Sequence, residues 1–184
     1  MKSNLQIISG KYRGKKLNLP ADARPTQNMA RGALFNMLND MLDTTKPFVV
    51  WDALAGSGAL GLECLSRFNN AKVIFTDNSK SSIDTIKKNL ASLNESATVE
   101  MIDSVSVLSK YGANADLVFI DPPYADFGLG ALFVKKLGKV AKNGAVLIWE
   151  FESNQQTPKI DDIWEIAKDK TYGRARFLFL VKNS

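Results

Sequence analysis

The sequence contains no histidine and a single cysteine, Cys64. Without histidine the chain cannot use Ser-His-Asp or Cys-His nucleophilic catalysis, imidazole acid–base chemistry or histidine metal ligands. One cysteine cannot form a disulfide within the chain. Any chemistry must therefore rest on carboxylates, backbone groups, hydroxyls or a reactive cofactor, and we expect no metal ion in the site.

The sequence also lacks an apolar run of transmembrane length and a charged-then-apolar leader. We therefore expect a cytoplasmic protein with no membrane partner. The 184 residues are enough for one α/β domain with a substantial core. The shares of apolar residues, 45%, and charged residues, 23%, are ordinary for a globular protein.

Acidic residues are scarce in the N-terminal segment. Up to Arg31 the chain has seven Lys and Arg and one anion, Asp22, whereas the remainder has 17 cations and 18 anions. A concentrated basic segment beside a neutral body predicts a polyanionic partner. The alternative is a solvated basic tail, which the interleaved apolar residues disfavour. Residues 5–19 alternate in polarity, with Gly10 and Gly14 flanking a connection, which predicts a small β-hairpin.

A helix is predicted over residues 29–42, and beyond Pro47 apolar strands alternate with amphipathic helices. This order predicts an α/β fold with a mostly parallel sheet. The last two strands are separated only by Tyr172-Gly173-Arg174, so they must form an antiparallel hairpin. The predicted strands are 48–54, 72–76, 98–102, 115–120, 144–151, 164–170 and 175–182, and the helices between them are 59–68, 79–93, 104–111 and 129–141.

A glycine-rich turn joins the first of these strands to its helix. Gly56, Gly58 and Gly61 fit the pattern G-x-G-x-x-G, which alone is a weak signal for a nucleotide-binding loop. Asp77, at the tip of the second strand, can accept hydrogen bonds from both hydroxyls of a ribose. Asp103, at the end of the third strand, could receive an adenine amino group.

Two cofactors compete for this loop. A dinucleotide places its pyrophosphate at the helix N-terminus. S-adenosylmethionine has no phosphate and carries a sulfonium and an ammonium group. Asp52, directly before the loop, would repel a pyrophosphate and attract these cations, which favours S-adenosylmethionine. A loop-capping role for Asp52 is the structural alternative.

The stretch Asp121-Pro122-Pro123-Tyr124 follows a buried strand. Two prolines cannot continue the hydrogen-bond ladder, so the chain leaves the sheet there with a carboxylate and an aromatic ring at its corner. Ligands of open α/β sheets bind at this edge. The corner suits a planar group that bears an amine, although alone it could be an ordinary turn.

Several stretches together resemble a class I S-adenosylmethionine-dependent methyltransferase, and more narrowly the RsmD-type family. That family methylates the exocyclic N2 of a guanine in bacterial 16S rRNA. The resemblance covers nearly the whole chain. It rests on residues 7–17, on Arg24-Pro25-Thr26, on residues 55–63, on Tyr172-Gly173 and on Asp121–Tyr124, which matches the [N/D]-P-P-[Y/F] signature of amino-group methyltransferases. Met29 and Gly32 depart from the family pattern, which affects RNA contacts rather than methyl transfer.

The resemblance implies a Rossmann-like sheet of seven strands over residues 27–184, preceded by a basic RNA-contacting hairpin extension over residues 1–26. It implies S-adenosylmethionine as cofactor and 16S rRNA as partner, free or within the small subunit or its assembly intermediate, with a monomer as the default. The implied catalytic residues are Asp121, Pro122 and Tyr124. Cofactor contacts are expected from Asp52, Ala55, Gly56, Ser57, Gly58, Asp77, Asn78, Asp103, Ser104 and Asp121. RNA contacts are expected from Lys11, Arg13, Lys15, Lys16, Arg24, Thr26, Arg31 and Tyr124.

Other functions stay open. The nearest is a DNA or RNA adenine-N6 methyltransferase, because the proline corner serves any exocyclic amine. A NAD-dependent oxidoreductase could use the same glycine loop. A non-catalytic RNA-binding or ribosome-assembly module is a third class, which the intact corner and loop disfavour.

Overall fold

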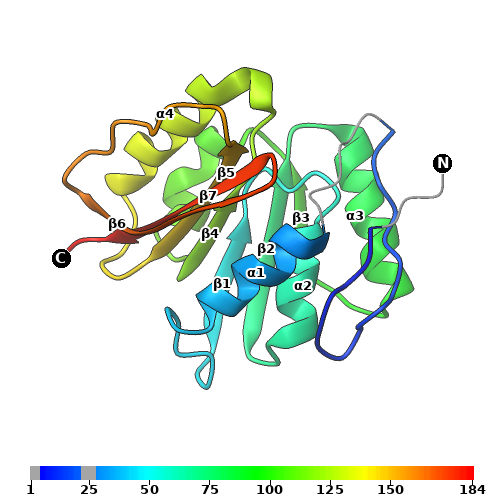
Figure 1. Cartoon of the computed structure of the whole chain (residues 1–184). Coiled ribbons are helices and arrows are strands. Elements are labelled where there is room, and N and C mark those ends of the chain that lie inside the picture. Colours follow the sequence, from blue (N-terminus) through cyan, green and yellow to red (C-terminus); the bar gives the residue numbers. More distant parts are fainter. Residues whose placement is uncertain (1–4, 22–27) are drawn as a thin grey trace.

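The computed structural model describes residues 5–21 and 28–184. Its centre is one seven-stranded sheet in the order β3-β2-β1-β4-β5-β7-β6 (Figure 1). The first five strands are parallel, β7 runs antiparallel to β5, and β6 runs antiparallel to β7. The predicted mostly parallel sheet with a C-terminal hairpin is therefore confirmed. The strands are β1 (Phe48–Asp52), β2 (Ala71–Asp77), β3 (Thr98–Met101), β4 (Leu117–Ile120), β5 (Val146–Glu152), β6 (Trp164–Tyr172) and β7 (Ala175–Lys182).

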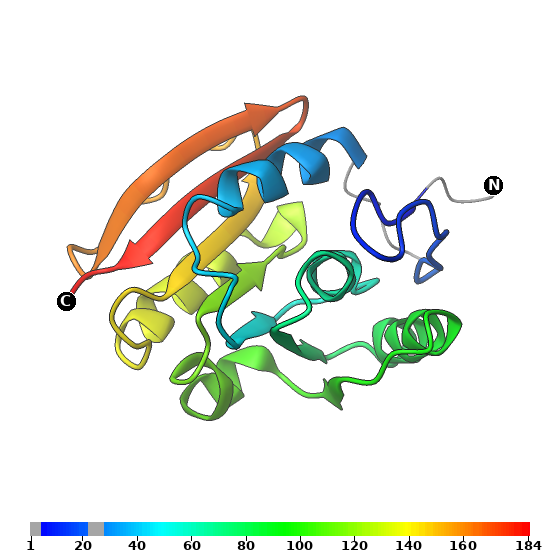
Figure 2. The same ribbon diagram turned by 90° about the horizontal axis from the view of Figure 1, so that it is seen from below.

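Helices cover both faces of the sheet (Figure 2). Helices α1 (Asn28–Leu38), α2 (Ala59–Arg67) and α3 (Lys80–Ser92) lie on one face. The short helices η1 (Ser104–Val107) and η2 (Leu108–Gly112), together with α4 (Phe127–Gly138), lie on the other. Both faces of the central parallel strands β1, β4 and β5 are buried, which is why these strands read as nearly continuous apolar runs. The helix η3 (Tyr124–Asp126) connects β4 to α4.

The predicted N-terminal hairpin is wrong. Residues 5–21 contain one isolated antiparallel bridge, between Gln6 and Lys16, and no strand. The backbone N–H groups of Ile8 and Ser9 donate to the Glu63 carboxylate of α2 instead, at 2.9 Å each. The cross-strand backbone bonds are limited to residues 5–7 and 14–17, and because buried backbone donors must be paired, the contacts with α2 take over beyond them. We call residues 5–21 the N-terminal loop.

The N-terminal loop belongs to the main hydrophobic core. Leu5, Ile7 and Leu17 are buried in the same cluster as residues of α1, α2 and the sheet. Further contacts tie the loop tip to α2, where Lys11 N–H donates to the Ser66 carbonyl at 2.9 Å. No helix within the described ranges is long and apolar enough to cross a membrane.

Candidate active site

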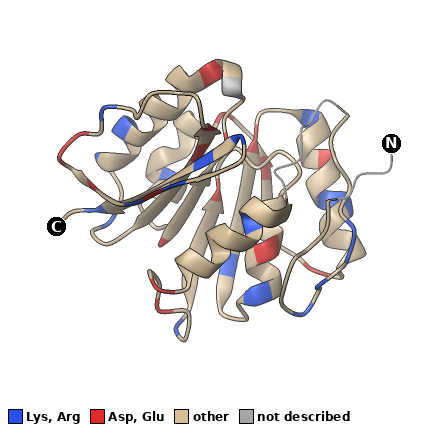
Figure 3. Cartoon of the chain, in the orientation of Figure 1, with Lys and Arg blue, Asp and Glu red and all other residues tan. Residues whose placement is uncertain are grey.

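The strand order places β1 between β2 and β4, so the chain reverses its winding direction between β1 and β4. Ligands of open α/β sheets bind outside the carboxyl ends of the strands at such a switch point. Asp52 ends β1 and Asp77 ends β2, while Asp121 directly follows β4. Figure 3 shows acidic residues at these strand ends. Residues far apart in sequence therefore form one acidic edge.

The glycine loop over residues 53–58 crosses this edge between β1 and α2. Gly56 has φ +53° and Gly58 has φ +76°, both in the left-handed region that favours glycine. A Cβ at Gly56 would meet open space, so a ligand can approach the backbone there. Gly61 serves a different purpose, because a Cβ there would lie 2.3 Å from the Phe75 ring. The third glycine of the motif thus allows α2 to pack closely on β2.

Asp77 holds the glycine loop and the start of α3. Its carboxylate accepts hydrogen bonds from the backbone N–H of Gly56, at 2.9 Å, and of Ser79, at 2.8 Å. The side chain is half-buried, and its neighbour Asn78 is exposed. Asp77 therefore stands beside the open part of the loop, in a position to accept hydrogen bonds from ribose hydroxyls.

The predicted cofactor contacts Asp103 and Ser104 are placed differently from each other. Asp103 is exposed and caps η1 through the Val105 N–H at 3.0 Å. Ser104 is buried, and its hydroxyl contacts the Ala53 carbonyl and, at 3.0 Å, the Thr76 hydroxyl. The side chain of Ser104 therefore stabilises the glycine loop through its hydrogen bond to Ala53. Only the backbone of Ser104 is left to contact a ligand.

Asp52 is 2% exposed and accepts a hydrogen bond from the Gly61 N–H at 2.9 Å. Burial raises the pKa of Asp52 to about 8, the Gly61 hydrogen bond opposes this shift, and the negative charges of Asp121 and Asp77 add to it. Both the capping role and the acidic surroundings are therefore present. A cation bound at this edge would relieve the repulsion among the three carboxylates, whereas a pyrophosphate would increase it.

This raised pKa predicts a pH-dependent stability difference. The folded protein holds a proton on Asp52 up to about pH 8, and the unfolded chain releases it near the ordinary value of 3.8. Stability therefore falls as pH rises between these values, by up to about 1.4 kcal/mol per pH unit. Asp52→Asn removes the titrating carboxyl group and keeps a side-chain oxygen that can accept the hydrogen bond from the Gly61 N–H.

Urea unfolding of the ligand-free wild type and Asp52→Asn should be compared at pH 5.5, 7.0 and 8.5. The free energy of unfolding of the variant relative to wild type is expected to rise from pH 5.5 to 8 and then level off. A difference that stays constant over this range would contradict the raised pKa.

The proline corner lies beside the loop. Asp121 is half-buried, Pro122 is buried and Pro123 is exposed, and η3 begins at Tyr124, whose side chain lies outside the described part of the structure. Asp126 caps α4 through the Leu129 N–H at 3.1 Å, which fixes where the chain turns back along the sheet. The backbone of the corner is thus held between β4 and a capped helix.

The predicted RNA-contacting lysines and arginine of the N-terminal loop lie away from this edge. Lys11, Arg13, Lys15 and Lys16 are exposed on the N-terminal loop (Figure 3). The loop tip is bonded to Ser66 in the last turn of α2, at the opposite end of that helix from the glycine loop. Arg24 and Thr26 lie outside the described residues.

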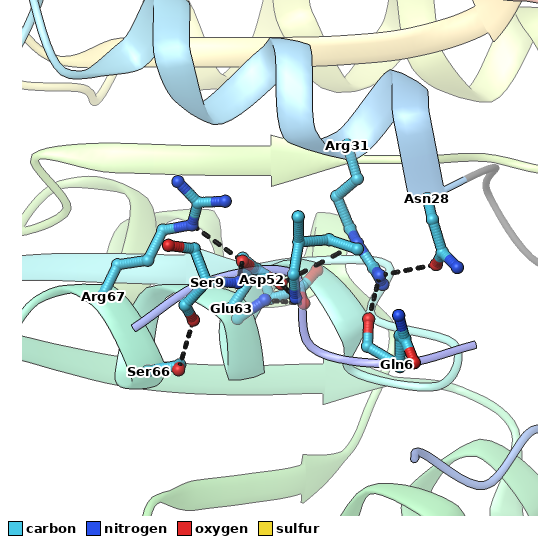
Figure 4. Close-up of polar contacts among 10 residues, drawn as sticks. Gln6, Ser9, Asn28, Arg31, Asp52, Glu63, Ser66 and Arg67 are labelled. Atoms are coloured by element: carbon cyan, nitrogen blue, oxygen red, sulfur yellow. Dashed lines mark hydrogen bonds and ion pairs between the residues drawn. The ribbon is translucent and has the colours of Figure 1, made fainter. Parts of the chain in front are cut away.

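Arg31 has a structural role instead of the predicted RNA contact. Its side chain is fully buried on α1 and donates to the Gln6 carbonyl and, at 3.0 Å, to Asn28 Oδ1 (Figure 4). Its Nε lies 4.0 Å from the Glu63 carboxylate. Burial lowers the pKa of Arg31, and the charge of Glu63 opposes that shift. A guanidinium enclosed in this way is not accessible to an RNA phosphate.

Two residues that matter for the site were missed in the sequence. Glu63 of α2 anchors the N-terminal loop and also accepts from Arg67 Nε at 2.7 Å. Asn89 of α3 contacts the glycine loop at the Ser57 carbonyl, at 3.0 Å. The available signal was the same for both: a polar side chain at a helix position that the apolar spacing marks as buried.

The residues at the acidic edge fit S-adenosylmethionine. Asp77 would hold the ribose, and residues 55–58 would contact the cofactor through their backbone. The Asp121 carboxylate matches the positive charges of the cofactor, and a bound cation would favour the charged form of Asp52 as well. The sheet order, the open glycine loop and the acidic switch point together define a class I S-adenosylmethionine-dependent methyltransferase.

The chain belongs to the family described as Conserved hypothetical protein 95, whose model matches residues 5–181. It is 32% identical to Ribosomal RNA small subunit methyltransferase D of Escherichia coli (strain K12), over 94% of this chain and 87% of the relative. It is 33% identical to the Haemophilus influenzae protein of the same name, over 94% and 91%. The solved structure of yhhF from Escherichia coli has a TM-score of 0.84 at 29% identity and covers 97% of this chain and 98% of that one. These matches confirm the family predicted from the motifs.

Proposed function

We propose that this protein transfers a methyl group from S-adenosylmethionine to the exocyclic N2 of a guanine in small-subunit (16S) rRNA. The observation that carries the proposal is the position of Asp121–Tyr124 at the end of β4, across the switch point from the glycine loop after β1. The names of the two relatives support rRNA of the small subunit as the substrate.

An exocyclic guanine amine is a poor nucleophile because its lone pair is delocalised into the ring. When bound, S-adenosylmethionine supplies a strongly electrophilic methyl group, so the protein has mainly to position the amine. The Asp121 carboxylate and the Pro122 carbonyl accept hydrogen bonds from the amino group and direct its lone pair. Tyr124 stacks on the flipped-out base, as aromatic side chains do with unpaired bases. The released proton passes to Asp121 or to water.

The substrate must reach well beyond the target base. Arg13, Lys15 and Lys16 form no ion pair with any described residue, so their charges are available to phosphates. They lie on the N-terminal loop, whose tip is bonded near the end of the nine-residue helix α2, about 12 Å along the helix from the glycine loop. A structured RNA can contact both places at once, and a mononucleotide cannot.

Replacing Arg13, Lys15 and Lys16 together by alanine is expected to weaken rRNA binding and to reduce its salt dependence. Each lost phosphate contact lowers the slope of log K against log[salt] by about 0.7–0.9, so the slope should fall by roughly two. Filter binding at several salt concentrations measures it. The matched control replaces Lys135, Lys136 and Lys139, which are exposed on the other face of the sheet, and should keep the wild-type slope. An unchanged slope in the variant of Arg13, Lys15 and Lys16 would show that these cations face solvent and do not contact RNA phosphates.

The activity is tested by incubating the protein with labelled S-adenosylmethionine and either 16S rRNA or small subunits from a strain that lacks the enzyme. The RNA is then digested to nucleosides. N2-methylguanosine is the expected product. N6-methyladenosine would point to the adenine alternative, and no incorporation into either substrate would point to a non-catalytic module.

A further inference from the structure

Asn89 lies on the buried face of α3 and is 0% exposed. Its side chain bridges two segments that are distant in sequence. On one side its Nδ2 donates to the Ser57 carbonyl in the glycine loop, at 3.0 Å. On the other side Asn89 meets Asn18 of the N-terminal loop through three hydrogen bonds.

The surroundings fix how the Asn89 amide is oriented. Its Nδ2 faces two carbonyl oxygens, those of Ser57 and Asn18, the latter at 3.1 Å. Its Oδ1 accepts from the Asn18 backbone N–H at 2.8 Å and from Asn18 Nδ2 at 2.9 Å. A rotated amide would place its oxygen against two carbonyls. The orientation that holds Ser57 is therefore also the one that holds the N-terminal loop.

Ser57 is a position at which the glycine loop needs such a contact. It stands between Gly56 and Gly58, both with positive φ, so the backbone on either side has unusual freedom. At the two glycines, the Gly56 N–H donates to the Asp77 carboxylate and the Gly58 N–H donates to the Ala55 carbonyl. The Asn89 amide holds the carbonyl between the two glycines.

We propose that Asn89 is a positioning residue for cofactor binding, which sets the glycine loop through Ser57 and makes its conformation depend on the docked N-terminal loop through Asn18. The inference rests on the proposed cofactor function of the loop. Loss of the bridge leaves the loop free to sample other conformations, and binding must then order it again.

The first test compares Asn89→Ala with Asn70→Ala. Asn70 is a matched control because its amide also donates to two backbone carbonyls, those of Thr44 and Thr45. It directly precedes β2 and therefore lies at the amino ends of the parallel strands, away from the glycine loop. Binding of S-adenosylhomocysteine is measured by calorimetry well below the melting temperature of each variant. Asn89→Ala is expected to raise Kd about tenfold or more. Asn70→Ala should stay within about twofold of wild type.

A second variant keeps the test valid if Asn89→Ala does not fold. The Asn18 side chain is exposed, so Asn18→Asp leaves the core unchanged. Its carboxylate faces Asn89 Oδ1 and opposes the amide orientation that holds Ser57. We expect Kd to rise about three- to tenfold in Asn18→Asp and less in Asn18→Ala, which keeps both backbone contacts.

The outcomes separate the two proposals. If wild type binds S-adenosylhomocysteine and the folded Asn89 and Asn18 variants bind it equally well, the positioning role is overturned. A lower melting temperature with unchanged Kd also overturns it, because that result shows a purely structural contact. If wild type itself does not bind S-adenosylhomocysteine, the proposed cofactor function fails, and the inference that depends on it fails as well.

Discussion

Asp121→Ala is expected to lower the rate of methyl transfer by at least about a hundredfold while changing the Kd for S-adenosylhomocysteine by no more than about threefold. The carboxylate follows β4 at the switch point and orients the acceptor amine in the proposed mechanism. Orientation of a weak nucleophile contributes mainly to the rate. S-adenosylhomocysteine lacks the sulfonium charge that the Asp121 carboxylate would match, so its affinity should change little. Single-turnover transfer to rRNA measures the first quantity and calorimetry the second.

Two further variants sharpen this result. Asp121→Asn keeps an oxygen that can accept from the amine and should lose only about tenfold, since the orienting hydrogen bond survives without the charge. Asp126→Ala removes an exposed carboxylate five residues further on, at the cap of α4, and should keep activity within a few-fold. Full activity in Asp121→Ala would remove this residue from the mechanism.

Glu63→Ala is expected to cause the largest loss of stability, about 3–5 kcal/mol. The Glu63 carboxylate is fully buried and accepts hydrogen bonds from the Ile8 and Ser9 backbone and from Arg67 (Figure 4). Its removal leaves the enclosed guanidinium of Arg31 without its closest countercharge and frees two backbone donors. Urea unfolding measures the change. Faster tryptic cleavage at Lys11 or Arg13 would report release of the N-terminal loop.

A double-mutant cycle identifies the cause. If an unpaired buried charge is responsible, Arg31→Met should restore part of the stability of Glu63→Ala, so the double variant loses less than the two single variants together. Lys80→Ala breaks an exposed ion pair with Asp84 and serves as the surface control, with scarcely any change expected. Strictly additive losses in the cycle would show that the ion pair does not explain the effect.

The charge segregation in the sequence predicted a basic N-terminal segment, and four of its cations are indeed exposed on the N-terminal loop. The same reasoning failed for Arg31, because composition does not distinguish a cation on the surface from one enclosed by α1, Gln6 and Glu63. Polarity alternation also predicted a hairpin where the structure has a single bridge. Alternation shows which residues are buried, and it does not show whether the backbone bonds to a strand or to a helix.

The sequence by itself determined the order of strands and helices, the glycine loop, and the carboxylates that end β1 and β2 and follow β4. These features depend on patterns within one element and the turn after it, which short stretches of chain specify. Only the tertiary structure decided that Glu63 anchors the N-terminal loop and that Asn89 joins Asn18 to Ser57. Those contacts join residues 32 to 71 positions apart, and they form because buried backbone groups must find partners wherever packing brings a polar side chain close.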